Sequence, residues 1–219
     1  MYVILNYFGR MSAWMLITAV IYMVVRKIYF AKSGKKPDMT KEICSMLLAA
    51  CAVSILSETV FPRIALGFAG GFHIQLNFTS GLVLGYENGD FFRFVSHGVE
   101  RSINFVPFKT IAQFLFHQED ARFPQEVWNI KRVINLFGNV FLFVPLGFLA
   151  PIAIKKADSF GKIFLIGSGY VLFIEITQYF TYRATDVDDY ILNMLGIMLG
   201  FWLYKILKNS FINKKLSAN

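Results

Sequence analysis

Two apolar stretches between residues 160 and 204, together with the short polar connector that joins them, hold polar residues that could do chemistry. They are Glu175, Gln178, Arg183, Asp186, Asp189 and Asn193. Groups that ionise are costly in lipid and usually face a bundle interior, a partner or a water-filled cavity, so this cluster predicts a functional site. Glu175 at such a depth needs a polar partner or a raised pKa, and Arg183 is its candidate partner.

Helical spacing places several of these residues on shared faces. Glu175 and Gln178 are three apart, and Asp189 and Asn193 form one stripe with two small residues, Gly196 and Gly200. A G-x-x-x-G pair lets a neighbouring backbone approach, which we expect to bring Asn193 toward the preceding helix.

Two further asparagines, Asn135 and Asn139, could complete the lining of a polar cavity open to the outer face. The alternative is that these amides and glycines are ordinary contacts between helices, each contributing about 1 kcal/mol or less. In that interpretation Arg183 only stabilises the turn by an ion pair with Asp186 or Asp189.

The composition requires a membrane around these residues. Of the 219 residues, 56% are hydrophobic and only 16% are charged, which exceeds the apolar share of soluble domains. A span needs about 20 apolar residues. We predict an all-α integral membrane protein, one membrane domain over residues 1–219, with about five transmembrane helices at 11–30, 43–61, 133–154, 160–180 and 190–207. The third contains Pro145 and Gly147, and the proline frees a carbonyl that neighbours must satisfy.

Basic residues predict the orientation of the spans. Of the 22 lysines and arginines, six lie from the end of span one to the start of span two, three from the end of span three to the start of span four, and four from the end of span five onward. The positive-inside rule makes these segments cytoplasmic and gives an N-out, C-in topology. The net charge of +8 is thereby explained without nucleic acid, because the basic residues lie at the ends of apolar runs.

The segment 62–129 forms an insertion on the outer side. Residues 73–79 alternate between polar and apolar, and Asn88-Gly89 is a turn signal, so a short hairpin is predicted. Residues 104–118 have helical spacing but are too short to span, which favours an interfacial or re-entrant helix. At the end of span two, Glu58 has Arg63 as a candidate partner.

The chain shows no recognisable catalytic or metal-binding motif. Its two cysteines, Cys44 and Cys51, suit apolar packing, and its three histidines have no H-E-x-x-H spacing. Four carboxylates near the outer surface could take calcium or magnesium, but we expect no metal and no cofactor.

Several short motifs together resemble the VanZ-like family over roughly residues 104–204. These are Asn104-x-x-Pro107-Phe108-x-Thr110-Ile111, Asn139-x-Phe141-x-Phe143-x-Pro145-x-Gly147, Glu175-x-x-Gln178, Arg183-x-x-Asp186-x-x-Asp189, Asn193, Gly196 and Gly200. The resemblance implies a multi-pass protein of the bacterial cell membrane, from a family named for an accessory role in resistance to the glycopeptide teicoplanin. It names a cell-envelope context and no reaction.

Three functions fit these residues. The first is binding of a lipid-linked cell-wall precursor, another lipid-linked envelope component or the lipidated antibiotic, with membrane lipids as surroundings and Arg183 meeting an anionic group. The second is an intramembrane enzyme that modifies a lipid or peptidoglycan precursor, with Glu175 as general base. The third is transport of a lipid or solute, for which an ionisable Glu175 would suit proton coupling. We expect the first, because no nucleophile and no internal repeat is evident.

Overall fold

Five long apolar helices form the body of the protein. The computed structural model describes residues 2–59, 63–67, 73–77, 82–87, 90–95, 103–116, 133–180 and 185–216. Within them, the helices long and apolar enough to cross a membrane are Gly9–Ser33, Met39–Thr59, Asn135–Ala153, Phe160–Phe180 and Val187–Asn209. The five predicted spans are confirmed to within a few residues at most of their ends.

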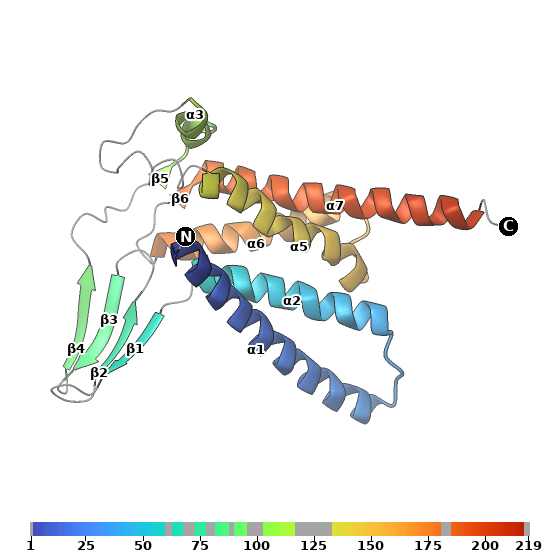
Figure 1. Cartoon of the computed structure of the whole chain (residues 1–219), viewed down its shortest axis with the longest axis horizontal. Helices are drawn as coiled ribbons and strands as arrows, with labels where there is room; N and C mark the ends of the chain where they lie inside the picture. The colour runs from blue at the N-terminus through green and yellow to red at the C-terminus, as the bar shows by residue number, and fades with distance from the viewer. Residues whose placement is uncertain are drawn as a thin grey trace.

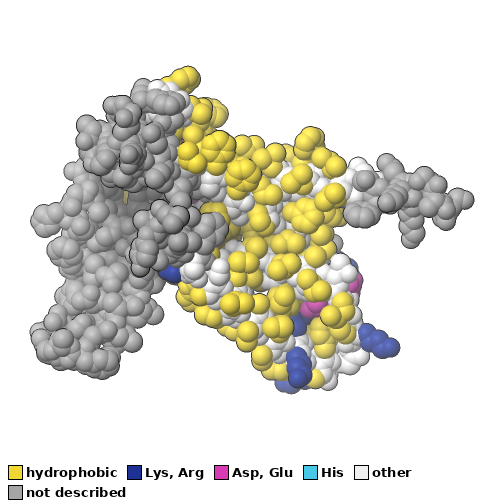
Figure 2. Space-filling view, viewed as in Figure 1, with side chains coloured by type: hydrophobic (Ala, Val, Ile, Leu, Met, Phe, Trp, Pro, Cys, Tyr) yellow, Lys and Arg dark blue, Asp and Glu magenta, His cyan; other side chains and the backbone are white. Residues whose placement is uncertain are grey.

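The elements divide into a bundle and a group at one of its ends. The bundle contains α1 (Tyr2–Ser33), α2 (Met39–Thr59), α5 (Asn139–Ala153), α6 (Phe160–Phe180) and α7 (Val187–Leu216). The N-terminus, the strands and the short α3 (Lys109–Leu115) lie at one end of the bundle, and the C-terminus lies at the other (Figure 1). Charge assigns the first end to the outside, and we call it the outer end. Hydrophobic side chains cover most of the helical surface in Figure 2.

A four-stranded antiparallel sheet forms the first part of the outer insertion, before β5 (Ile103–Asn104) and α3. Its strands are β1 (Arg63–Gly67), β2 (His73–Asn77), β3 (Leu82–Glu87) and β4 (Asp90–Val95), in the order β1-β2-β3-β4. The alternation at residues 73–77 therefore predicts a strand correctly, although the structure forms a larger sheet than the expected hairpin. Glu87 pairs with Asp90 on either side of the Asn88-Gly89 turn signal.

The helices α1 and α2 form a hairpin with an arginine–glutamate pair near each end. Arg10 donates to Glu58 with Nε 3.0 Å from Oε1, and Arg26 donates to Glu42 with Nε 2.6 Å from Oε2. Arg10 and Arg26 are about 24 Å apart along the helix axis at about 1.5 Å per residue, close to the thickness of a hydrocarbon core. The two pairs thus fix the register of the hairpin near both membrane boundaries.

Glu58 has a partner in α1 that the sequence did not indicate. Arg10 supplies a guanidinium, because an antiparallel helix hairpin brings residues near its two open ends together. The side chain of Arg63, the expected partner, lies outside the described residues, so that contact stays a prediction. No described side chain of α1 is fully buried. The polar contacts that join α1 to α2 include the two arginine–glutamate pairs and the Ser54 hydroxyl, which donates to the Met11 carbonyl at 3.2 Å.

The closest helix contact in the bundle joins α5 and α7 through glycines. A Cβ added to Gly196 would lie 2.2 Å from the carbonyl oxygen of Val140, and one added to Gly200 would lie 2.0 Å from that of Val144. Gly147 of α5 approaches the Ile197 carbonyl of α7 in the same way. The glycines therefore bring two backbones together as predicted, but the partner of Gly196 and Gly200 is α5, the third span, and not α6. Helices α5 and α7 run in the same direction (Figure 1), which the sequence pattern of small residues does not reveal.

Candidate functional site at the outer end of the bundle

Asp186 joins the start of α7 to the segment before α3. It belongs to β6 (Thr185–Asp186), which pairs in parallel with β5 (Ile103–Asn104). Its Oδ1 accepts a hydrogen bond from Asn104 Nδ2 at 3.0 Å and one from the backbone N–H of Asp188 at 3.0 Å. Its Oδ2 accepts from the Thr110 hydroxyl. Asp186 is thus the N-cap of α7. It also binds two side chains from a distant part of the chain, because Asn104 lies 82 positions earlier and Thr110 lies 76 positions earlier.

Asp188 is completely buried and holds the first turn of α3. Its Oδ1 accepts from the backbone N–H of Phe108 at 2.5 Å, and its Oδ2 accepts from those of Thr110 at 2.7 Å and Ile111 at 3.0 Å. Phe108 has a φ of 65°, a left-handed conformation that costs of order 1–3 kcal/mol in a non-glycine residue. The three bonds to one carboxylate offset that cost and fix α3 at the outer end of α7.

A π-helical turn, η1 (Ile134–Gly138), precedes α5 and carries Asn135 of the predicted asparagine pair, while Asn139 is the first residue of α5. Asn139 Nδ2 donates to Asn135 Oδ1 at 3.2 Å and to Asp189 Oδ1 at 2.8 Å. Both hydrogens of this amide are then used. The predicted association of Asn135 and Asn139 with Asp189 is therefore present, and π turns recur at functional sites.

Three more of the predicted polar residues are buried just below this layer. Glu175, Gln178 and Asn193 are each 5% exposed. The Thr185 hydroxyl donates to the backbone carbonyl of Glu175 at 3.4 Å, which places the end of α6 beside the start of α7. Asn193 follows Asp189 by one helical turn, and its Oδ1 is buried with no hydrogen-bond partner among the described residues. A buried acceptor in that state costs about 1–3 kcal/mol.

The side chains beside the docked α3 are apolar and exposed. Between residues 103 and 116 the large hydrophobic residues more than half exposed are Phe105, Val106, Phe108, Leu115 and Phe116. They lie at the end of the bundle where the spans end (Figure 1). The expected short helix is therefore present as α3, shorter than predicted. It offers an apolar surface next to the polar layer, and its interfacial or re-entrant position in the membrane stays a prediction.

Arg183 lies outside the described residues, so its predicted contact with Glu175 stays a prediction. Within the described part of the chain, no group of three or more His, Cys, Asp or Glu side chains could hold a metal ion. Four segments fix hydrogen-bond donors and acceptors at the outer end of the bundle. They are η1–α5, α6, β6–α7 and β5–α3.

A family model described as VanZ/LLP1 matches residues 82–208. The chain belongs to the VanZ/LLP1 family. The match begins at β3 and ends within α7, so it contains every element of the site, while α1 and α2 lie outside it. No curated protein and no solved structure gives a significant match. Taken with its five apolar helices, the family identifies a VanZ-like multi-pass membrane protein.

Sequence reasoning missed Asp188, which is the most buried carboxylate in the described VanZ/LLP1 region. Asp186-Val187-Asp188 immediately precedes a long apolar run, and acidic residues at such a position favour capping. This signal could have indicated a cap, but the sequence does not reveal that Asp188 caps a different helix. Asn104 and Thr110 were part of the family motif, and the structure shows both of them bonded to Asp186.

Proposed function

We propose that this VanZ/LLP1 protein resides in the bacterial cell membrane and binds a lipid-linked envelope component or a lipidated glycopeptide such as teicoplanin at its outer end. The observation that carries the proposal is the buried Oδ1 of Asn193, which has no donor among the described residues. Such an acceptor is retained where a water molecule or a ligand supplies the donor. Peptide and sugar groups of cell-wall precursors and glycopeptides are rich in N–H and O–H donors.

The neighbouring contacts support recognition of a polar head group. Asn139 Nδ2 and Asp189 Oδ1 lie 2.8 Å apart, and Asp189 is one helical turn above Asn193. The close contact between α5 and α7 fixes the positions of these side chains. A site built on rigid helices presents its hydrogen bonds with little ordering cost on binding. The head group would therefore lie between α5, α6 and α7.

The exposed apolar side chains of residues 105–116 support a lipid portion in the same ligand. Phe105 and Phe116 are 77% and 78% exposed, which is unfavourable in water and favourable against an acyl or prenyl chain. Because Asp186 and Asp188 anchor this segment directly to α7, its apolar surface has a fixed place beside the buried amides. A ligand with a polar head and a hydrocarbon tail matches both.

Asn193→Leu tests the proposal, because leucine has a similar volume and removes the buried polar group. We expect the thermal stability of the variant to stay the same or rise, since no hydrogen bond within the described protein is lost. We expect retention of co-purifying envelope lipids, measured by mass spectrometry, and binding of teicoplanin to fall at least tenfold. Asn209→Leu, at an exposed position of α7 near the inner end, is the matched control.

The same experiment separates binding from turnover. Glu175→Gln retains the shape of a buried side chain but cannot act as a general base. If Glu175→Gln binds the lipid component as the unaltered protein does, binding needs no proton transfer. Retention of the full lipid complement by Asn193→Leu would refute the proposed site.

A further inference from the structure

An apolar cavity lies near the middle of the bundle, away from the outer polar layer. It has a volume of about 170 Å³ and lies where α2, α5, α6 and α7 meet. Its wall includes Leu48, Ala52, Ala150, Ile154, Ile163 and Ile166. The only side-chain polar atom on its lining residues is the Tyr170 hydroxyl, and this donates to the Ala52 carbonyl at 2.7 Å. The cavity therefore offers nothing to water.

The cavity is not sealed from the membrane. Ile166 lines it and is nevertheless 44% exposed, so the wall opens on the face of α6 that meets lipid. Apolar cavities of about 150 Å³ stay dry and accept small hydrocarbons. The space here accommodates on the order of six carbons by the same comparison, which is a segment of one lipid chain.

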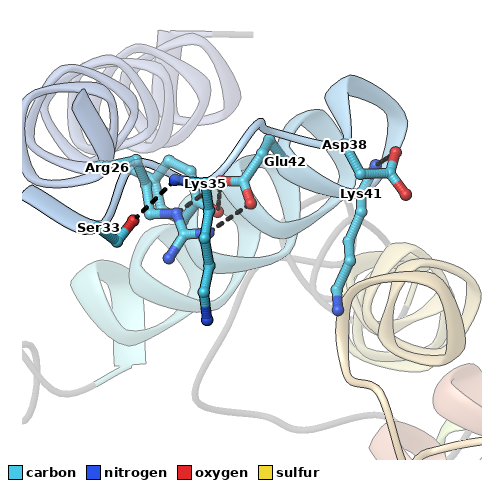
Figure 3. A network of polar contacts seen from close by, with 7 residues as sticks. Arg26, Ser33, Lys35, Asp38, Lys41 and Glu42 are labelled. Carbon is cyan, nitrogen blue, oxygen red and sulfur yellow. Dashed lines mark hydrogen bonds and ion pairs between the residues drawn. The ribbon is translucent and has the colours of Figure 1, made fainter. Parts of the chain in front are cut away.

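Lysines adjoin the cavity at its inner end. Lys155 and Lys156 directly follow Ile154, and both are exposed with no ion pair among the described residues. Lys162 directly precedes Ile163 and pairs with Asp158 at 2.7 Å. Lys35 of the connector before α2 and Lys41 in the first turn of α2 add two more lysines. Their ammonium groups extend away from the Arg26–Glu42 pair in Figure 3. Positive charge thus surrounds the inner end of the helices that form the cavity.

We propose that the protein binds an anionic phospholipid of the inner leaflet between α2 and α6. One acyl chain occupies the apolar cavity, and the phosphate group meets Lys155 and Lys156. Basic clusters between helices on the cytoplasmic side hold anionic head groups in this way. The positive-inside rule alone explains lysines at this level, but it does not explain an open apolar cavity beside them. The site is separate from the outer polar layer and does not rest on the function proposed above.

The test uses the full chain, delipidated in detergent, with added lipid and with binding read by native mass spectrometry. Dioleoylphosphatidylglycerol should bind at least tenfold more tightly than dioleoylphosphatidylcholine. Lys155→Gln with Lys156→Gln should lower the phosphatidylglycerol affinity on the order of twentyfold, from about fivefold per lysine, and leave phosphatidylcholine unchanged. Lys27→Gln with Lys32→Gln, two exposed lysines of α1, is the charge-matched control and should change neither affinity.

Two variants test the cavity itself. Ala150→Leu fills it from inside, and Ile166→Phe narrows its exposed opening, so that the second remains informative if the first does not fold. Each should weaken both lipids at least fivefold. Three results would each overturn the proposal. The two lipids could bind with equal affinity, the control lysine pair could have the same effect as Lys155 and Lys156, or a folded cavity variant could bind lipid unchanged. Full competition of inorganic phosphate with phosphatidylglycerol would overturn it as well, because the acyl chain would then contribute nothing to the affinity.

Discussion

Replacing Asp188 by asparagine should detach α3 and lower the stability of the outer end. The carboxylate accepts three backbone N–H groups, from Phe108, Thr110 and Ile111, and it is fully buried. Asparagine keeps the shape but turns one acceptor oxygen into an N–H₂ donor. At least one backbone N–H would then face another donor with no water available.

The size of the effect follows from these contacts. A hydrogen bond to a charged group contributes about 1.5–3 kcal/mol, and a buried donor left without a partner costs about 1–3 kcal/mol. One bond lost and two bonds weakened by loss of charge give a destabilisation of about 3–5 kcal/mol. For a chain of this size that corresponds to a lowering of Tm on the order of 10 °C. The strain at Phe108 adds to the tendency of α3 to leave its site.

Two measurements check this reasoning. Thermal unfolding in detergent gives the change in Tm, and hydrogen exchange reports the protection of the Phe108, Thr110 and Ile111 amides. Asp158→Asn, at an exposed acid of the inner connector, is the control and should leave the protection of these amides unchanged. If Asp188→Asn kept both the Tm and the protection of the unaltered protein, the carboxylate would not be what holds α3.

Three further predictions concern the rest of the bundle. Gly200→Ala should destabilise the protein by about 2–3 kcal/mol, because its Cβ would meet the Val144 carbonyl at 2.0 Å. Thermal unfolding measures this loss. Gly169→Ala is the control and should leave the stability unchanged, because nothing lies within 4 Å of its added Cβ. Arg10→Ala should cost about 2–4 kcal/mol because it removes a guanidinium from a carboxylate that is only 9% exposed, whereas adding Glu58→Ala should restore part of the loss. Additive losses would contradict the pairing. The Lys162 ammonium lowers the pKa of Asp158, so its small stabilising contribution should be present above pH 4 and disappear as the pH falls through the lowered pKa. In an NMR titration, Lys162→Gln should raise the pKa of Asp158 toward its usual value.

The spans could be predicted because the bilayer imposes a simple rule on the sequence. About 20 apolar residues are needed to cross it, and the five runs in this chain end at basic or polar residues that mark its boundaries. The alternation of residues 73–77 likewise predicts a strand. The pairing of helices could not be predicted in this way. Gly196 and Gly200 indicate a close backbone contact, but nothing in their spacing distinguishes α5 from α6 as the partner.

The sequence predicts which residues form the candidate site better than it predicts their contacts. Polar residues inside apolar helices stand out, so Asn139, Asp189 and Asn193 were identified from the sequence alone. The bond from Asn139 to Asp189 joins positions 50 apart, and those to Asp188 join positions about 80 apart. Such contacts depend on the path of the connectors, which leaves no periodic signal in the sequence.

The contacts of the aspartates favour recognition over acid–base chemistry at the outer end. Asp186 and Asp188 each have both carboxylate oxygens bonded to donors of the β5–α3 segment or of α7 itself. A carboxylate that must accept several structural hydrogen bonds is poorly placed to exchange protons with a substrate. Asn139 has already used both of its amide hydrogens, so it has none left for the Asn193 oxygen one turn below Asp189. The Asn193 oxygen has no donor among the described residues, and it belongs to an amide, a group that binds donors over the whole physiological pH range and does not catalyse proton transfer.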